Sequence, residues 1–256
     1  MARKPLGIQV SPLVWREAPI ELTQCLMRDR AQWAKNKTIR VGLRFGNGDA
    51  LVSRLRSMIA SEFIDMGRDD VLVMIDHDTV WSDGDVERIA RQAHACDGIV
   101  GGMVPKRGKG QGIASFPVAE VELQQGKSEL VEATFVGSAF CAYSAKAMRH
   151  IVDHYKLPPC VGFGGINSFY PLFLPMPIES KARPGYCEYL SEDYALCVRA
   201  QLAGVPVYLD QKPVLKHMDG NHAWTVAEAM DGARKVGGID PLGLAALKEH
   251  YRGKTA

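Results

Sequence analysis

Long apolar segments and secretion signals are missing from this sequence of 256 residues. No apolar run approaches the ~20 residues that a membrane-spanning helix needs. The first residues, Met1–Leu6, include basic side chains, but no apolar stretch follows them, so we expect no secretory signal. These absences favour a cytoplasmic protein without a transmembrane segment.

Net charge is also small. The chain has 31 Lys and Arg residues against 29 Asp and Glu residues, which leaves a formal charge of +2 at neutral pH. A balance of this kind demands neither nucleic acid nor an anionic membrane as a partner.

Regular cysteine and glycine motifs are lacking too. The six cysteines are scattered and form no C-x-x-C pair, so we expect free thiols in a reducing compartment and no zinc site. Gly46-Asn-Gly48 begins a G-x-G pattern, but Leu51 stands where a dinucleotide fingerprint needs its third glycine. We find no internal repeat, no low-complexity tract and no linker between independent domains.

The most informative feature present is the segment Val71–Thr79, in which an apolar run ends at Asp76-His77-Asp78. A short apolar run of this kind predicts a strand that is buried on both faces of an α/β sheet. In extended geometry Asp76 and Asp78 would project to the same side of the rim where α/β sheets bind ligands. Two adjacent carboxylates favour a divalent cation that also carries phosphate oxygens. The alternative is a strand followed by ordinary acidic turn residues.

Strand and helix patterns alternate through the first half of the chain. We expect strands at 7–10, 39–45, 71–76 and 98–104, and helices at 20–34, 51–66 and from a capping box at Ser82–Asp85 onward. Asp49 is a candidate cap for the second helix, and Gly67 is its expected end. This alternation predicts an α/β fold with a mostly parallel central sheet flanked by helices.

The second half is less regular. Residues 105–112 form a basic, glycine-rich loop, which is either an exposed turn or a ligand-binding segment. We expect antiparallel strands at 113–123 and 129–135, one strand at 135–143 and a helix at 144–155. The stretch 157–186 has no periodicity and is typical of either a substrate-binding lid or a disordered segment, and its many aromatic residues favour the lid.

A second acidic cluster and a histidine follow. Ser191 is a candidate cap for a helix that begins with Glu192-Asp193 and ends near Gly204. Helix capping alone would explain both acidic residues. His217 comes after the strand 205–210, where imidazole could complete a metal site or serve as a hydrogen-bonded structural group.

Four segments in this order resemble the GT-A class of nucleotide-sugar glycosyltransferases, especially family 2-like enzymes of bacterial or phage type. They are VMIDHD, FVGSAFCAYS, SEDYALCVRAQLAGVPVYLD and HMDG, and the resemblance runs from about Ile39 to Gly220. The first strand lacks the proline-rich opening of that family, so the sequence does not locate the nucleobase pocket. In the helix before VMIDHD, Ser57 stands where an Asn often follows the arginine, which is Arg56 here.

The resemblance implies roles for the acidic groups and the histidine. Asp78 would bind Mn²⁺ or Mg²⁺ directly, Asp76 would contact the ribose or a metal-bound water, and His217 would supply the remaining protein ligand. Asp193, or less favourably Glu192, would deprotonate the acceptor hydroxyl in an inverting displacement.

The resemblance also suggests residues that contact the donor and the acceptor. Phosphate oxygens would pair with Arg56 or with Lys106, Arg107 and Lys109 of the basic loop. Gly137 and Ser138 would shape the wall between donor and acceptor. Four aromatic residues could stack on a sugar or belong to the core, namely Phe163, Phe169, Tyr170 and Trp224.

We therefore expect a single GT-A-like catalytic domain over 1–256, with a donor half (1–105), an acceptor half (106–220) and a helical tail (221–256). The predicted activity is metal-dependent transfer of a sugar from a nucleotide-diphosphate donor, UDP-linked by preference. The alternatives are a nucleotidyltransferase and a catalytically silent nucleotide- or sugar-binding protein. The acceptor stays open between saccharide, protein, lipid and modified DNA.

Overall fold

The protein is described by a computed structural model that covers residues 4–162, 168–180, 183–232 and 235–237. Six helices lie in these ranges: α1 (Ile20–Trp33), α2 (Val52–Met66), α3 (Asp85–Cys96), α4 (Ala145–Tyr155), α5 (Glu192–Leu202) and α6 (Val226–Met230). None of these described helices is both long and apolar enough to cross a membrane. All six cysteines are free thiols, as expected.

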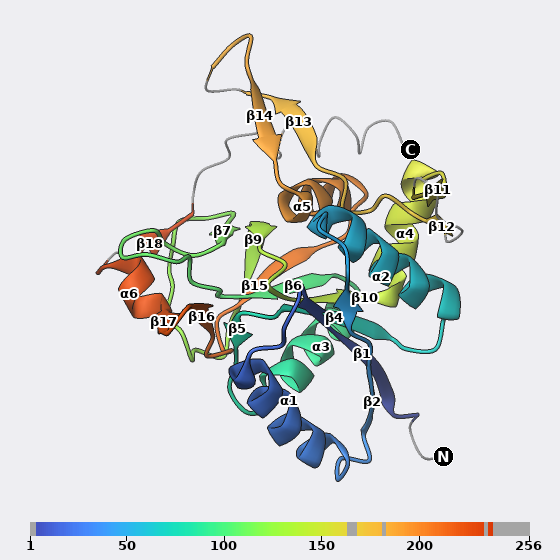
Figure 1. Cartoon of the computed structure of the whole chain (residues 1–256). Coiled ribbons are helices and arrows are strands. Elements are labelled where there is room, and N and C mark those ends of the chain that lie inside the picture. The colour runs from blue at the N-terminus through green and yellow to red at the C-terminus, as the bar shows by residue number, and fades with distance from the viewer. Residues whose placement is uncertain (1–3, 163–167, 181–182, 233–234, 238–256) are drawn as a thin grey trace.

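A nine-stranded sheet forms the centre of the molecule (Figure 1). In spatial order its main path is β2 (Ile39–Leu43), β1 (Leu6–Val14), β4 (Val71–Asp76), β10 (Phe140–Ser144), β6 (Ile99–Gly102), β15 (Val207–Asp210), β9 (Leu130–Val136) and β7 (Ser115–Pro117), with β3 (Gly46–Asn47) beside the end of β1. Strands β2, β1 and β4 are parallel to one another, as are β6 and β15. Strand β10 runs antiparallel between β4 and β6. The predicted α/β fold with a mostly parallel sheet is confirmed.

Small antiparallel sheets surround this centre. They are β5 (Thr79–Val80) with β16 (Lys216–Asp219) and β17 (His222–Thr225), β13 (Met176–Glu179) with β14 (Cys187–Leu190), β11 (Cys160–Val161) with β12 (Ser168–Phe169), and β8 (Val121–Glu122) with β18 (Lys235–Val236). The hairpin β13–β14 projects from the body beyond α5 (Figure 1).

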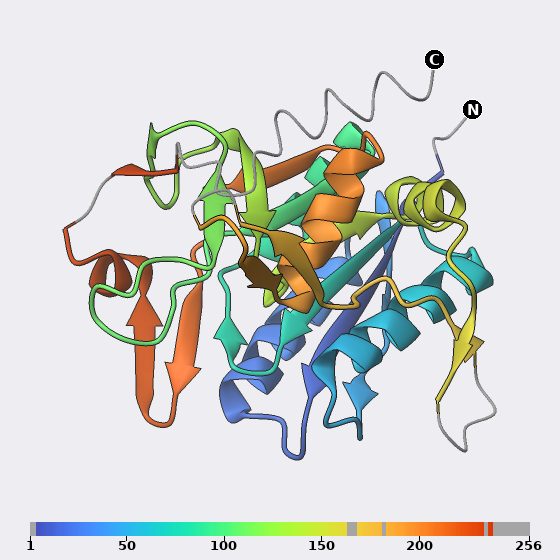
Figure 2. The same cartoon turned by 90° about the horizontal axis from the view of Figure 1, so that it is seen from above.

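Alternate residues of each central strand point to opposite faces of the sheet. Both faces are buried, because a hydrophobic core with its helices covers each one. In β4, Val71, Val73 and Ile75 pack into the core beneath α1 and α3. Leu72 and Met74 pack into the second core beneath α2, α4 and α5. Figures 1 and 2 show the two groups of helices on opposite sides of the sheet. The apolar run before Asp76 therefore has the double burial that its sequence predicts.

The segment predicted as one strand over 135–143 is in fact two strands. Strand β9 ends at Val136, residues 137–139 turn, and β10 begins at Phe140 in a different position of the sheet. At Gly137 a Cβ atom would lie 2.9 Å from both the Cβ and the carbonyl oxygen of Ala114. The glycine thus allows this turn to pack against residue 114, and the single-strand prediction is wrong.

Predicted helix starts are also corrected in detail. Helix α3 begins at Asp85 after Gly84, whose φ of 76° is left-handed, and Ser82 does not cap it. Of the two hydrogen bonds of a capping box, only the one from the Ser82 N–H to Asp85 Oδ2 forms, at 2.9 Å. Asp49 accepts from the Leu51 N–H at 2.9 Å, but Leu51 is itself the N-cap of α2, so Asp49 is not the cap.

Two further expectations meet the structure only in part. The stretch 157–186 contains the short strands β11 to β13, with residues 163–167 and 181–182 outside the described residues. The tail expected to be helical begins as strand β17, and its described helix is α6 alone. Residues 238–256 lie outside the described residues, and the division into donor and acceptor halves stays a prediction.

Candidate functional site

A pocket of about 250 Å³ opens at the carboxyl ends of β1 and β4. Its walls are Leu13–Trp15 at the end of β1, Asp49–Leu55 around the start of α2, and Asp76–Asp78. Ligands bind at this edge in open α/β sheets because the loops there leave a crevice. The pocket is lined by apolar and aromatic side chains and by carboxylates. The sequence alone did not identify Trp15 or Asp49 as part of this pocket.

The two carboxylates of the D-x-D segment face different partners. Strand β4 ends at Asp76, and His77 and Asp78 form a turn instead of continuing the strand. The turn arises because the chain leaves the central sheet to pair with β16, where the Met218 N–H donates to the Asp78 carbonyl at 2.7 Å. The expectation that Asp76 and Asp78 project from one extended strand is therefore wrong.

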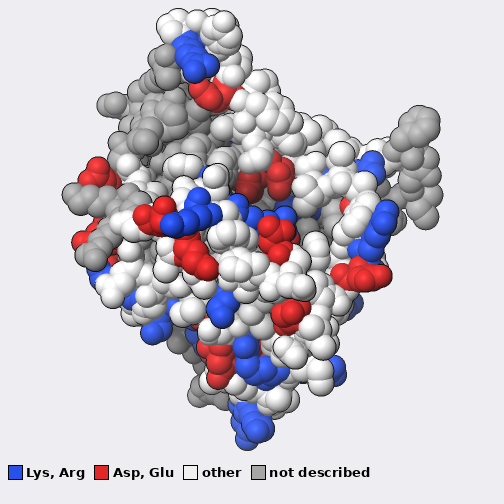
Figure 3. Space-filling view, turned by 60° about the vertical axis from the view of Figure 1, so that its left-hand side comes forward, with Lys and Arg blue, Asp and Glu red and all other residues white. Residues whose placement is uncertain are grey.

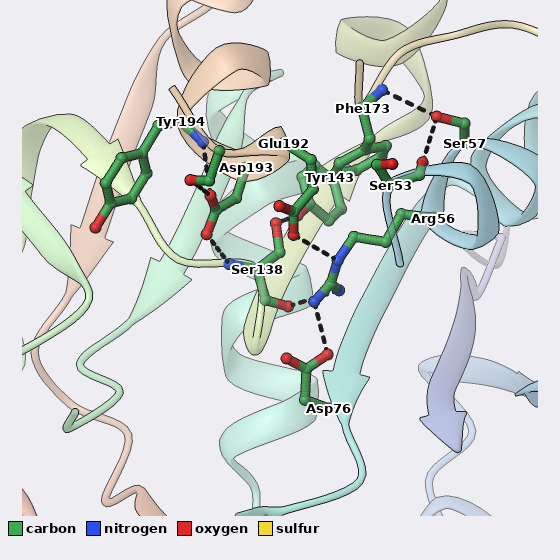
Figure 4. Close-up of polar contacts among 11 residues, drawn as sticks. Ser53, Arg56, Ser57, Asp76, Ser138, Tyr143, Phe173, Glu192, Asp193 and Tyr194 are labelled. Carbon is green, nitrogen blue, oxygen red and sulfur yellow. Dashed lines mark hydrogen bonds and ion pairs between the residues drawn. The ribbon is translucent and has the colours of Figure 1, made fainter. Parts of the chain in front are cut away.

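Asp76 contacts Arg56, which is buried at the centre of a polar cluster (Figure 4). The Arg56 side chain is only 3% exposed and donates to Asp76 Oδ1 at 2.7 Å. It also donates to the Ser138 carbonyl at 3.3 Å, and its Nε lies 3.4 Å from Glu192 Oε1. Arg56 thus connects α2, β4, the 137–139 turn and α5, regions that lie far apart in the sequence.

This arrangement changes the interpretation of Arg56. Burial by itself lowers the pKa of Arg56, but Asp76, Tyr143 and Glu192 outweigh that effect and raise the pKa above its ordinary value. A cation paired in this way stays charged and holds its carboxylates in fixed positions. The predicted pairing of Arg56 with phosphate is untested, and its described contacts are with carboxylates and a carbonyl.

Asp193 lies in the first turn of α5 beside the 137–139 turn. Its Oδ1 accepts from the Tyr194 N–H at 2.9 Å and from the Ser191 hydroxyl, and its Oδ2 lies 3.4 Å from the Ser138 N–H. Ser191 is at the N-cap position, as predicted, but its side chain bonds Asp193 instead of a backbone N–H. These donors fix the direction of the Asp193 carboxylate.

The neighbouring Glu192 is in a different environment. Burial, with the charge of Asp193 as the next cause, raises the pKa of Glu192, and Arg56 opposes this increase. Glu192 is therefore a partner of the buried arginine, whereas Asp193 is held by neutral donors. Ser138 is 3% exposed, and its hydroxyl lies 2.8 Å from the Tyr143 hydroxyl, so its side chain belongs to the interior of this cluster.

Asp78 forms a second cluster with His217 and Arg107. Asp78 Oδ2 lies 3.5 Å from His217 Nε2 and also pairs with the Arg107 guanidinium. Burial raises the pKa of Asp78, but the hydrogen bond and charge of His217 and the charge of Arg107 reduce it below its ordinary value. Burial lowers the pKa of His217, and the bond and charge of Asp78 outweigh burial and raise it.

The contacts of His217 fix its tautomer. Its Nδ1 lies 2.9 Å from the Pro105 carbonyl, which can only accept, so Nδ1 carries the proton. In the protonated ring Nε2–H faces the Asp78 carboxylate, which is the contact that raises the pKa of His217, and in the neutral ring Nε2 is the nitrogen left to bind a cation. A hydrogen bond from one ring nitrogen to a carbonyl is the usual support for a metal-binding histidine.

Asp78 and His217 offer one oxygen and one nitrogen to a cation between them. Within the described ranges, no group of three or more His, Cys, Asp or Glu side chains is arranged to hold a metal. The pair suits Mg²⁺ or Mn²⁺ that takes its other ligands from phosphates and water, as Mg²⁺ commonly does. The assignment of Asp76, Asp78 and His217 as metal ligands stays a prediction.

The other predicted residues of the basic loop are placed differently from Arg107. Lys106 Nζ lies 5.6 Å from the centre of the Phe116 ring, and Lys109 pairs with Asp231 at 3.3 Å. On the face in Figure 3, the described acidic and basic side chains are interspersed.

The four candidate aromatic residues do not form one described cluster. Phe163 lies outside the described residues. Phe169 and Tyr170 lie at the end of β12, where the Tyr170 N–H donates to Ser61 Oγ at 2.7 Å and its ring packs against the core. Trp224 lies on β17, opposite His217 in the strand pairing.

Comparisons with known proteins agree with the fold. No family model and no curated protein matches the sequence. A solved structure described as A197 from STIV matches with a TM-score of 0.54 and 13% identity, over 92% of this chain and 95% of that one.

A structure of GalNAc-T7 with UDP, GalNAc and Mn²⁺ matches with a TM-score of 0.48 and 8% identity, over 88% of this chain and 46% of that one. This second similarity is too remote to bear on the fold or on the function. The sheet order, with one antiparallel strand inserted in a mostly parallel sheet, is consistent with a GT-A-like fold, and no family is assigned.

Proposed function

We propose that this protein is a metal-dependent glycosyltransferase that moves a sugar from a nucleotide-diphosphate donor, preferably a UDP-sugar, to an acceptor hydroxyl. The observation that carries the proposal is the proximity of Asp78 to His217, whose Nδ1 is bonded to the Pro105 carbonyl, so that Nε2 is the ring nitrogen beside the carboxylate. This pair adjoins the pocket at the carboxyl edge of the sheet, because Asp78 also lines that pocket.

The pocket is proposed to hold the nucleoside of the donor. Its apolar and aromatic wall at Leu13–Trp15 suits a base, and Asp76 at its rim is 27% exposed and could accept from a ribose hydroxyl. Asp78 and His217 would hold Mg²⁺ or Mn²⁺, which when bound neutralises the charge that develops on the diphosphate leaving group.

Asp193 is proposed as the general base. It would take the proton from the acceptor hydroxyl while that oxygen forms a bond to the anomeric carbon. The bond from this carbon to the phosphate oxygen breaks at the same time, and the nucleoside diphosphate leaves with the electron pair, so the configuration inverts. The hydrogen bonds to Asp193 support this role because they direct the carboxylate without neutralising it.

A thermal-shift screen of nucleotide sugars tests the proposal without knowledge of the acceptor. Ligands that bind only the native state raise the melting temperature. We expect one group of nucleotide sugars to stabilise the protein in Mn²⁺ and to lose this effect in EDTA. The absence of stabilisation by any nucleotide sugar, or release of pyrophosphate from a nucleoside triphosphate, would count against a glycosyltransferase.

A further inference from the structure

Arg107 occupies the position beside Asp78 where a bound cation is expected. Its guanidinium pairs with Asp78 Oδ2, the same oxygen that lies 3.5 Å from His217 Nε2. Its Nε also donates to the Met218 carbonyl at 3.1 Å. Arg107 of the basic loop therefore contacts the same carboxylate oxygen of Asp78 that faces His217.

The backbone of the basic loop is anchored, whereas the side chain of Arg107 is accessible. The Lys106 N–H donates to the Gly112 carbonyl at 2.9 Å, and the Gly112 N–H donates to the Ala229 carbonyl at 2.8 Å. Arg107 itself is 45% exposed. The guanidinium can therefore rotate away from Asp78 while the loop keeps its place against α6.

A divalent ion and this guanidinium cannot share Asp78 Oδ2 without strong repulsion. Two cations a few ångströms apart repel each other, and the partly buried position of Asp78 reduces the screening by water. Metal binding thus requires Arg107 to leave the carboxylate. A diphosphate arriving with the metal would offer the displaced guanidinium a new bidentate partner.

We propose that Arg107 is an exchangeable counter-ion. It neutralises Asp78 in the free protein, weakens binding of a divalent ion alone, and moves to the donor diphosphate when metal and nucleotide bind together. This inference rests on the proposed function, and it adds that metal and nucleotide binding are coupled through one named side chain. Coupling of this kind is reciprocal, so each ligand increases the affinity for the other by the same factor.

Calorimetric titrations of Mn²⁺, without and with saturating UDP, test the proposal on wild type, Arg107→Gln and Lys109→Gln. Lys109 is a matched control because it lies in the same loop, carries the same charge and pairs with Asp231 instead of Asp78. We expect Arg107→Gln to bind Mn²⁺ alone about tenfold more tightly than wild type, within the usual range of coupling factors. UDP should then increase Mn²⁺ affinity less in this variant, and Lys109→Gln should behave as wild type.

An unchanged or weaker affinity of Arg107→Gln for Mn²⁺ alone overturns the inference, as does an equal gain in Lys109→Gln. If wild type still binds Mn²⁺ and UDP together, the proposed function survives that result. If neither wild type nor Arg107→Gln binds Mn²⁺ with or without UDP, both the inference and the proposed function fail. Melting curves of the three proteins confirm that each is folded.

Discussion

At the scale of single residues, the adjacent acids Glu192 and Asp193 have opposite environments. Glu192 faces the buried Arg56, whereas Asp193 is held by the Tyr194 and Ser138 N–H groups. A general base needs a fixed direction, and these hydrogen bonds give Asp193 one. The difference arises because successive residues of a helix point in different directions.

Replacement of Asp193 by Asn keeps the size of the side chain and removes its basicity. We expect Asp193→Asn to bind the donor with near-normal affinity and to turn over at least ~10²-fold more slowly, which is the usual contribution of a general base. Donor affinity by calorimetry and the turnover rate give the two values. Glu192→Gln is the matched comparison, and we expect it to lower the melting temperature because Arg56 loses a charged partner. Equal losses of affinity and rate in Asp193→Asn would indicate a structural role.

The sequence singled out candidate site residues but not the partners that they contact. The types and order of Asp78, Asp193 and His217 singled them out before any geometry was known. The contact of Arg56 with Glu192 spans 136 positions in sequence, and no local pattern reports such a contact. The same holds for Arg107, which was expected to contact phosphate and is found on Asp78.

At the scale of elements, strand β4 and the 137–139 turn show what local patterns can and cannot reveal. The apolar run of β4 predicts its burial directly. The mostly apolar sequence over 135–143 concealed a turn, because both flanking strands are buried and their residues look alike. Gly137 was the available signal, since glycine inside a strand pattern often marks a close approach of backbone.

The packing of Gly137 leads to a stability prediction. In Gly137→Ala the new methyl group would meet Ala114 at 2.9 Å, partly against a backbone carbonyl that cannot move freely. We expect a loss of about 1–3 kcal/mol in the free energy of unfolding, as for other overpacked sites. Gly42→Ala on β2 is the control, because nothing lies within 4 Å of its added Cβ. Urea denaturation measures both variants, and equal stabilities would refute the packing argument.

The start of α3 leads to a prediction about pH. Asp85 is buried, and burial raises its pKa to about 6, with added repulsion from Asp210 and Asp29. An unfolded Asp titrates near ~3.9, so between that pH and about 6 the folded state holds the proton that the unfolded state has lost. Stability therefore decreases as pH rises through this window, and the full penalty is present above it.

Asp85→Asn should remove this dependence. Asp85 Oδ2 accepts both the Ser82 and the Val214 N–H groups, at 2.9 and 3.1 Å, and the single carbonyl oxygen of Asn can accept both. We expect the variant to be more stable than wild type at pH 8, by up to about 3 kcal/mol, and equal to it near pH 4. Urea denaturation across pH tests this, with Asp83→Asn as an exposed control in the same loop. A variant that keeps the pH slope of wild type would contradict the assignment to Asp85.

At the scale of the whole molecule, the site depends on pairings that the order of elements does not specify. Alternation of strands and helices predicted a parallel sheet with two covered faces. It could not predict that β10 would insert antiparallel between β4 and β6, because nonlocal pairing depends on packing across the entire chain. It also could not predict that β16 would pair with β5, which brings His217 to Asp78.

The central claim is that nucleotide binding depends on a divalent metal held by Asp78. Calorimetric titration of UDP into the wild-type protein, in Mn²⁺ and then in EDTA, tests it most directly. We predict binding in Mn²⁺ and an affinity at least about tenfold weaker in EDTA, which corresponds to about 1.4 kcal/mol. Asp78→Ala should remain folded and should bind UDP in Mn²⁺ no better than wild type does in EDTA. An affinity for UDP that is undiminished in EDTA would contradict the account.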